Sequence, residues 1–313
     1  MSEFEMLSVN DLRDTPHVST VIEIFAKRFP YFKSAIPRQF ASFGPQWLEA
    51  FEKELAIFFK NDAVGMQTAT EGYGRFALDG MRLQRIFDKT LQYENKTYAE
   101  ADQEVYQNRE YMFSLYLPGI LLSHYLWRHH YQQQLFYRDK FLNRVLNHGG
   151  KLFYDVGVGT GFYSKEMLKD VPGIKGEGFD LSPFALEHTM KLLTKWDLEK
   201  RYSPNLCNII TEPIKRPAPF IINIEVLEHL EDPQSFIDAL FRMLEPGGFG
   251  LISAAITAPN ADHIYLYNNA REVIQQLESA GFILLEYVED PAYEPRKQTD
   301  SVPRNGAFIV TRK

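Results

Sequence analysis

Residues 151–161 read KLFYDVGVGTG, and this stretch decides the fold. An apolar run leads into Asp155, glycines then stand at alternate positions, and residues 162–168 have the composition of a helix. Because glycine has no Cβ, a turn built from it lets the backbone lie directly against a ligand. The stretch therefore predicts a strand, a ligand-binding turn and a helix. The glycines of the turn are Gly157, Gly159 and Gly161.

A second strand, expected over residues 174–179, ends in Asp180. A carboxylate at this place accepts hydrogen bonds from ribose hydroxyls, which fits either a dinucleotide or S-adenosylmethionine. A pyrophosphate requires the spacing G-x-G-x-x-G, whereas here Gly161 follows Gly159 by two positions and the turn has no Lys or Arg. The turn therefore resembles motif I of class I S-adenosylmethionine-dependent methyltransferases, and Asp180 is similar to the acid of their motif II.

Two later segments extend the resemblance. A buried strand, expected over 220–224, leads into EVLEHLEDP at 225–233, which is similar to the small-molecule branch of this family. EPGG at 245–248 precedes a strand expected over 249–255. The resemblance covers about residues 138–313 and implies an α/β fold, a Rossmann-like seven-stranded sheet whose last strand is antiparallel to the sixth. We expect residues 1–137 to form a helical lid and substrate region.

The resemblance also implies roles for single residues. Asp155, the three glycines, Asp180 and its neighbour Leu181 are expected to bind S-adenosylmethionine, and Glu225 to lie beside its methionine portion. We expect the third strand over 206–210, which places Glu212 near the adenine amino group. Glu228 and His229 are expected to cap the next helix and to take no part in the chemistry.

Composition limits the partners of the chain. The 313 residues carry a formal net charge of −7, and no basic block is present, so nucleic acid is not expected as a substrate. One cysteine fits a reducing compartment, residues 1–14 lack the apolar core of a secretory signal, and no run of eighteen apolar residues exists. We expect a cytoplasmic enzyme without a membrane partner, and a homodimer is compatible with the sequence.

The N-terminal half reads as mainly helical. Helices are expected over 18–28 and 45–59, a glycine-interrupted stretch over 66–84, and further helix over 85–116. Residues 1–17 are expected to form a poorly structured or capping arm.

An aromatic segment over 111–137 is expected to break at Pro118-Gly119 and continue as a helix. It either packs on the nucleotide-binding fold or acts as a lid whose aromatic faces contact substrate and the sulfonium cation, in which case Tyr125 is the candidate. Its histidines, His124, His129 and His130, lack the i, i+4 spacing that places two imidazoles on one helical face, so we expect no metal site.

Two loops are expected at the carboxyl ends of the strands, where ligands bind in such sheets. The loop 256–267 contains His263, which either removes a proton from a nucleophile or orders the loop through a backbone carbonyl. The connection 289–305 ends in Arg304 and Asn305, which either contact substrate or the cofactor's amino-acid portion or form a solvated turn.

The resemblance implies in-line transfer of a methyl group to a small molecule, helped by alignment and exclusion of water. A second hypothesis uses the same cofactor but attacks the aminocarboxypropyl carbon, as in azetidine-2-carboxylate synthases, and releases methylthioadenosine. A binding module that has lost catalysis is disfavoured by the intact glycines, Asp155 and Asp180.

Overall fold

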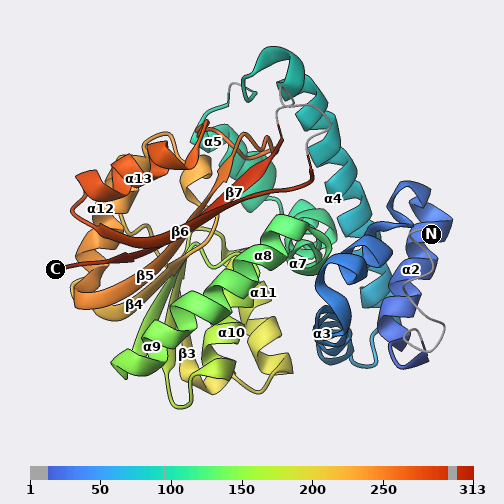
Figure 1. Cartoon of the computed structure of the whole chain (residues 1–313), viewed down its shortest axis with the longest axis horizontal. Coiled ribbons are helices and arrows are strands. Elements are labelled where there is room, and N and C mark those ends of the chain that lie inside the picture. Colours follow the sequence, from blue (N-terminus) through green and yellow to red (C-terminus); the bar gives the residue numbers. More distant parts are fainter. Residues whose placement is uncertain (1–12, 95, 295–301) are drawn as a thin grey trace.

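The computed structural model describes residues 13–94, 96–294 and 302–313. It contains one seven-stranded sheet with helices on both faces, and a group of N-terminal helices lies beside it (Figure 1). The strand order is β3-β2-β1-β4-β5-β7-β6; β1 to β5 are parallel, and β7 runs antiparallel between β5 and β6. The predicted α/β fold with its antiparallel last strand is confirmed. The strands are β1 (Leu152–Val156), β2 (Lys175–Asp180), β3 (Tyr202–Leu206), β4 (Ala218–Asn223), β5 (Leu244–Ile256), β6 (Ile283–Pro291) and β7 (Arg304–Thr311).

Helices precede the sheet and connect most of its strands. Those before the sheet are α2 (Pro16–Arg28), η1 (Pro30–Phe32), α3 (Ala35–Phe58), α4 (Ala63–Thr90), α5 (Tyr98–Ala101), η2 (Asp102–Tyr106), α6 (Arg109–Tyr111), η3 (Met112–Tyr116), α7 (Leu117–Leu126), α8 (Arg128–Phe136), η4 (Tyr137–Phe141) and α9 (Leu142–His148). Those within the sheet region are α10 (Phe162–Asp170), α11 (Pro183–Lys195), η5 (Glu199–Arg201), η6 (Leu227–His229), α12 (Pro233–Met243) and α13 (Ala270–Ser279). None of the helices in the described ranges is long and apolar enough to cross a membrane.

Alternate residues of the central strands pack into two hydrophobic cores, one on each face of the sheet. Phe153 of β1 packs in the core that contains α10, α11 and the N-terminal helices, whereas its neighbour Tyr154 packs in the core under α12 and α13. All six residues of β4 are buried, as expected for a parallel strand covered on both faces. The first core therefore runs without interruption from the sheet into the N-terminal helices.

The third strand lies four residues before its expected position. β3 covers Tyr202–Leu206 and pairs with β2 at the edge of the sheet, so Ser203, Pro204 and Leu206 are exposed. An edge strand tolerates proline and polar residues because one side of its backbone needs no partner. Of the more apolar run at 206–210, only Leu206 belongs to the strand and residues 207–210 follow it, so the predicted position of the strand is wrong.

The helix α4 is continuous from Ala63 to Thr90, so the prediction of a glycine-interrupted stretch is also wrong. Its glycines serve close packing. A Cβ at Gly72 would lie 2.4 Å from the carbonyl oxygen of Ser114, and one at Gly74 would lie 2.7 Å from the ring of Phe29. The helix expected over 45–59 is confirmed within α3, which begins earlier and kinks at Gly44.

The N-terminal helices and the sheet are joined by a buried ion pair. Lys165 on α10 pairs with Glu54 on α3, and both side chains are almost completely buried. The backbone is also helical across residue 137, from α8 through a π-helical turn into α9. A division of the chain near 137 stays a prediction. Residues 1–12, most of the expected arm, lie outside the described residues.

Candidate functional site

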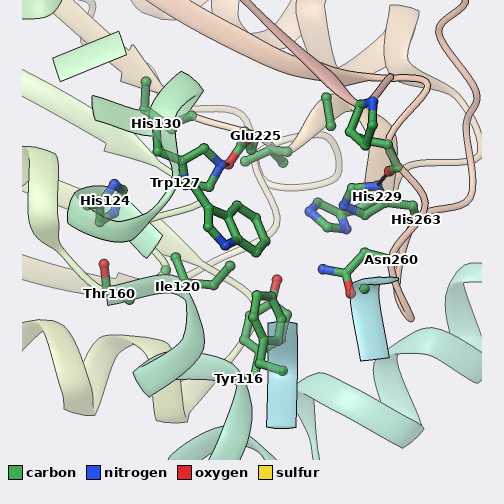
Figure 2. Close-up of a pocket in the computed structure, with 18 of the residues that line it drawn as sticks. Tyr116, Ile120, His124, Trp127, His130, Thr160, Glu225, His229, Asn260 and His263 are labelled. Carbon is green, nitrogen blue, oxygen red and sulfur yellow. Dashed lines mark hydrogen bonds and ion pairs between the residues drawn. The ribbon is translucent and has the colours of Figure 1, made fainter. Parts of the chain in front are cut away.

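A cavity of about 1750 Å³ lies at the carboxyl ends of β1, β2, β4 and β5 and extends beneath α3, α4 and α7. Ligand sites in proteins commonly measure about 300–1,000 Å³, so this cavity has room for two molecules. The turn 157–160 and Asp180 line one part, and His229, Asn260 and His263 line another. Figure 2 shows the second part, where Tyr116 and Trp127 face the two histidines across the cavity. We call the space between these residues the reaction chamber.

The glycine turn is shaped by its neighbours and by the cavity. Gly157, Gly159 and Gly161 all have positive φ, between +51° and +77°. A Cβ at Gly157 would lie 2.3 Å from Cγ2 of Val226, and one at Gly161 would lie 2.6 Å from Cγ2 of Thr189. At Gly159 a Cβ would meet no protein atom, and this residue lines the cavity. Two glycines therefore permit protein packing, and Gly159 permits close approach of a ligand.

Two carboxylates flank the turn. Asp155 is buried and accepts a hydrogen bond of 2.5 Å from Ser164 Oγ. Burial raises the pKa of Asp155 to about 7, against the opposing effect of that hydrogen bond. Asp180 accepts hydrogen bonds from the amides of Gly159, at 3.3 Å, and Ser182, at 2.8 Å. Burial raises the pKa of Asp180 as well.

After β3, the residues that line the cavity differ from the one expected to bind adenine. Leu181 lines the cavity as predicted, but Glu212 is exposed and is not among the described residues that line it. Cys207 and Asn208, which directly follow β3, line it instead. A contact of Glu212 with the adenine group is therefore not supported by its position, for the same reason that the third strand lies earlier than expected.

Glu225 connects three parts of the fold at the end of β4. Its φ is +52°, and its amide donates to the backbone and side-chain oxygens of Ser253. Its carboxylate accepts a hydrogen bond from Asn305 Nδ2 and lies 3.3 Å from Nε2 of His130 on α8. Although burial acts in the opposite direction, His130 holds the pKa of Glu225 well below its usual range. Glu225 thus presents a fixed negative charge at the cavity.

Two predicted contact residues do not reach the cavity. Asn305 is buried on β7 and binds Glu225, so it positions that carboxylate. Tyr125 is buried on α7, where its ring stacks on Phe51 with centroids 5.0 Å apart and its hydroxyl donates to Glu54 at 3.2 Å. Neither is among the described residues that line the cavity. The face of α7 that carries Ile120 and His124 lines it instead, so a substrate contact by Tyr125 is not supported.

His263 lines the reaction chamber, and its ring has a defined tautomer. Nδ1 lies 2.5 Å from the carbonyl oxygen of Ala258, so Nδ1 carries the hydrogen and Nε2 the lone pair. Burial lowers the pKa of His263 to about 4, so the ring is neutral near pH 7. The loop-ordering role considered for His263 is thus present, and it leaves Nε2 as an acceptor.

His229 lies next to His263, with ring centroids 4.8 Å apart. Its Nδ1 lies 3.1 Å from the backbone oxygen of Asp262 and 3.3 Å from Oδ2 of the same residue. Although burial opposes it, Asp262 raises the pKa of His229. Tyr106 and Tyr116 also hydrogen-bond to the Asp262 carboxylate.

Glu228 and His229 do not cap the next helix, contrary to expectation. They belong to η6, and Asp232 caps α12 by accepting from the amide of Ser235. The Glu228 carbonyl accepts from the amides of Ile264 and Tyr265, which fixes the loop after β5. Burial raises the pKa of the Glu228 carboxyl to about 8.

Several lining residues were not identified from the sequence. Trp127 ends α7 with extended backbone and begins α8, so the break in the aromatic segment lies at this residue and not at Pro118-Gly119. Asn260 reaches the chamber from the loop after β5, and Tyr116 ends a π-helical turn (Figure 2). Only the spacing of aromatic residues around 111–137 pointed towards such contacts. Beyond β6, the described part of the connection 289–305 reaches the cavity, as predicted, at Ala292, Tyr293, Glu294, Pro303 and Arg304.

Known proteins share this fold and these motifs. A family model described as a methyltransferase domain matches residues 127–287. Ubiquinone biosynthesis O-methyltransferase of Pseudomonas fluorescens (strain Pf0-1) is 29% identical over 124 residues, which cover 40% of this chain and 53% of that protein. The chain thus spans about half the length of the curated relatives it matches.

Two solved structures resemble the chain over most of its length. An O-methyltransferase family protein from Burkholderia thailandensis has a TM-score of 0.54 and 14% identity, covering 79% of this chain and 72% of its own. Human N-acetylserotonin methyltransferase, solved with its cofactor, has the same TM-score and identity and covers 79% and 70%. With the family model matching more than half of its residues, this chain belongs to the class I S-adenosylmethionine-dependent methyltransferases.

Proposed function

We propose that the protein transfers the methyl group of S-adenosylmethionine to a hydroxyl group of a small molecule held in the reaction chamber. The observation that carries this proposal is the continuity of one cavity from the glycine turn and Asp180 to His229, Asn260 and His263. Cofactor and substrate can therefore meet without leaving the protein.

Charge in the cavity supports a particular orientation of the cofactor. Asp180 accepts from the ribose, and the ionised carboxylate of Glu225 attracts the ammonium group of the methionine portion. The sulfonium then lies towards the chamber, where the faces of Trp127 and Tyr116 favour a cation. The methyl group points at the space in front of His263.

A hydroxyl nucleophile loses its proton during the reaction. When no metal ion is bound, Nε2 of His263 accepts this proton. The ring is neutral near pH 7, and its Nδ1 donates to the carbonyl of Ala258. The C–O bond forms as the C–S bond breaks, and S-adenosylhomocysteine leaves. The curated relatives are O-methyltransferases by name, which agrees with a hydroxyl acceptor.

The N-terminal helices contribute alignment and exclusion of water, which together are worth roughly 7–11 kcal/mol of a displacement barrier. They cover the chamber through α4, η3 and α7, and the buried pair of Lys165 and Glu54 fixes this cover on α10. No bound nucleic acid or membrane is required for this chemistry.

The test is mass spectrometry of purified protein incubated with S-adenosylmethionine, first alone and then with a metabolite extract. S-adenosylhomocysteine that forms only with extract, together with a product heavier by one methyl group, supports the proposal. Methylthioadenosine formed without added substrate, above the background of the cofactor alone, overturns it and indicates displacement at the aminocarboxypropyl carbon. The variant His263→Ala separates the proton acceptor from cofactor binding, because it should lower kcat and leave the affinity for S-adenosylmethionine unchanged.

A further inference from the structure

Three side chains of the kinds that bind metal ions meet at the wall of the reaction chamber. One ligand atom from each of Glu228, His229 and His263 lies within 4.8 Å of the other two. Glu228 and His229 come from η6 after β4, whereas His263 comes from the loop after β5. Backbone hydrogen bonds from Ile264 and Tyr265 to the Glu228 carbonyl, at 2.8 and 2.9 Å, hold the two segments together.

Both imidazoles are oriented as metal ligands commonly are. Nδ1 of His263 faces the Ala258 carbonyl, and Nδ1 of His229 faces the backbone oxygen and carboxylate of Asp262. In each neutral ring the remaining lone pair is therefore on Nε2. A carboxylate or carbonyl behind the second ring nitrogen fixes the tautomer and raises the basicity of the ligand. Asp262 is itself held by Tyr106, whose hydroxyl lies 2.8 Å from Oδ2.

Glu228 lacks the partner that a buried carboxyl needs. Its side chain is fully buried, and among the described residues neither carboxylate oxygen has a hydrogen-bond partner of normal geometry. The nearby acid Glu225 is already committed to His130 and Asn305. Burying a carboxyl group without a hydrogen-bond partner is costly, and a bound cation that pairs with the carboxylate would remove that cost.

We propose that Glu228, His229 and His263 bind one divalent transition-metal ion, of the class of Zn²⁺, Co²⁺ or Fe²⁺, at the wall of the reaction chamber. Two imidazoles and one carboxylate suit these ions, whereas Mg²⁺ and Ca²⁺ prefer oxygen ligands. Two ligands with bond lengths near 2.1 Å in tetrahedral geometry are about 3.4 Å apart, so a pair at the 4.8 Å limit would close by about 1.4 Å on binding. His229 and His263 line the cavity, which leaves the open coordination positions facing substrate.

The chemical role of the ion rests on the proposed function. An ion at this wall lowers the pKa of a substrate hydroxyl, whose proton then passes to solvent before the oxygen attacks the methyl carbon. In that state Nε2 of His263 binds the ion and is no longer the proton acceptor. The binding itself requires no assumption about the substrate.

The experiment uses Co²⁺ as the probe with the full chain after removal of metals by a chelator. We expect a visible absorption band that saturates at one Co²⁺ per chain. Glu228→Gln and His263→Ala should each weaken Co²⁺ binding by more than about 100-fold, and Asp262→Asn by about 10- to 100-fold, as losses of ligand and outer-shell groups do. His148→Ala is the matched control, since it removes an exposed histidine of α9 that does not line the cavity, and its affinity should equal that of the unchanged protein.

Two results would overturn the proposal. One is the absence of a saturable band, and the other is equal Co²⁺ affinity in the unchanged protein and in His263→Ala, which would place the ion elsewhere on the surface. His263 is in a partly exposed loop, so this variant tests the site even where Glu228→Gln fails to fold. Zn²⁺ should displace Co²⁺, whereas displacement by Mg²⁺ at equal concentration would refute the assigned class of ion.

The metal site and the proposed function fail separately. Methyl transfer by chelator-treated protein that binds no Co²⁺ overturns the site and keeps the function. Saturable Co²⁺ binding that depends on Glu228 and His263, with methylthioadenosine as the product, keeps the site and overturns the function.

Discussion

Alanine at Gly157 and at Gly159 should separate protein packing from ligand approach within one turn. Both residues have positive φ, +73° and +51°, which costs an L-residue roughly 1–2 kcal/mol. At Gly157 the new Cβ would also lie 2.3 Å from Cγ2 of Val226, a β-branched side chain with little rotamer freedom, which adds about 1–3 kcal/mol of overpacking. We expect Gly157→Ala to lose about 2–5 kcal/mol of unfolding free energy and Gly159→Ala about 1–2 kcal/mol.

The affinity for S-adenosylmethionine should follow the opposite order. A Cβ at Gly159 meets no protein atom and projects where the turn borders the cavity, so it displaces the cofactor itself. We expect Gly159→Ala to weaken calorimetric binding by more than about 10-fold at a temperature where it remains folded, because 1.4 kcal/mol of lost contact is tenfold. Urea unfolding of the cofactor-free proteins measures the first quantity. Unchanged affinity in Gly159→Ala, or equal loss of stability in both variants, would refute this account of the turn.

Four further predictions use other parts of the structure. Asp180→Asn should weaken S-adenosylmethionine binding by about 1.5–3 kcal/mol in calorimetry through loss of a charged acceptor, and unchanged affinity would remove Asp180 from the cofactor site. Tyr125→Phe should lose about 1 kcal/mol of unfolding free energy through its bond to Glu54 and leave kcat/KM unchanged, whereas a fall in kcat/KM without loss of stability would place the hydroxyl at the substrate. Lys165→Met should cost about 3–5 kcal/mol in urea unfolding because it leaves Glu54 buried without its Lys165 partner, and a neutral result would show that this ion pair does not stabilise the fold. Because the pKa of Asp155 is raised to about 7 in the folded state, its protonated form stabilises the fold at low pH and the cofactor-free protein loses stability as pH rises from about 4 to 7. In Asp155→Asn the fall in unfolding free energy between pH 5 and pH 8 should be smaller by about 2–3 kcal/mol, and an unaltered pH dependence would contradict the shift.

The sequence predicts what depends on short-range chemistry. The turn at 157–161 can be predicted because three glycines at fixed spacing, all with positive φ, are compatible with few backbone structures. The position of Asp180 can be predicted because it ends a strand. The third strand is hard to place from the sequence because most of its residues are exposed at a sheet edge. It therefore lacks the run of apolar residues that marks a buried strand. The glycines of α4 were misread because close helix packing and a break in a helix use the same residue.

The shape of the reaction chamber depends on contacts between residues far apart in the sequence, which a local sequence pattern does not predict. Asn305 is predicted as a substrate contact from its position at the end of a loop, yet the register of β7 beside β5 places it against Glu225, eighty residues earlier in the sequence. Trp127 and Tyr116 belong to an aromatic segment in which every ring is an equally plausible substrate contact. The packing of η3 and α7 against α4, and of α7 against α3, decides which rings face the cavity.

Glu225 shows why the helical region and the sheet act together. Its carboxylate lies beside His130 from α8 and accepts a hydrogen bond from Asn305 of β7, so the charge that we propose binds the cofactor is held from both parts of the chain. The buried pair of Lys165 on α10 and Glu54 on α3 makes a second link. A hinge motion that lifted α8 from the sheet would separate His130 from the Glu225 carboxylate and leave Asn305 as the remaining one of these two partners. If Glu225 binds the cofactor as proposed, this motion and cofactor binding are coupled through the Glu225 side chain, and by reciprocity the arrangement with α8 on the sheet binds the cofactor more tightly.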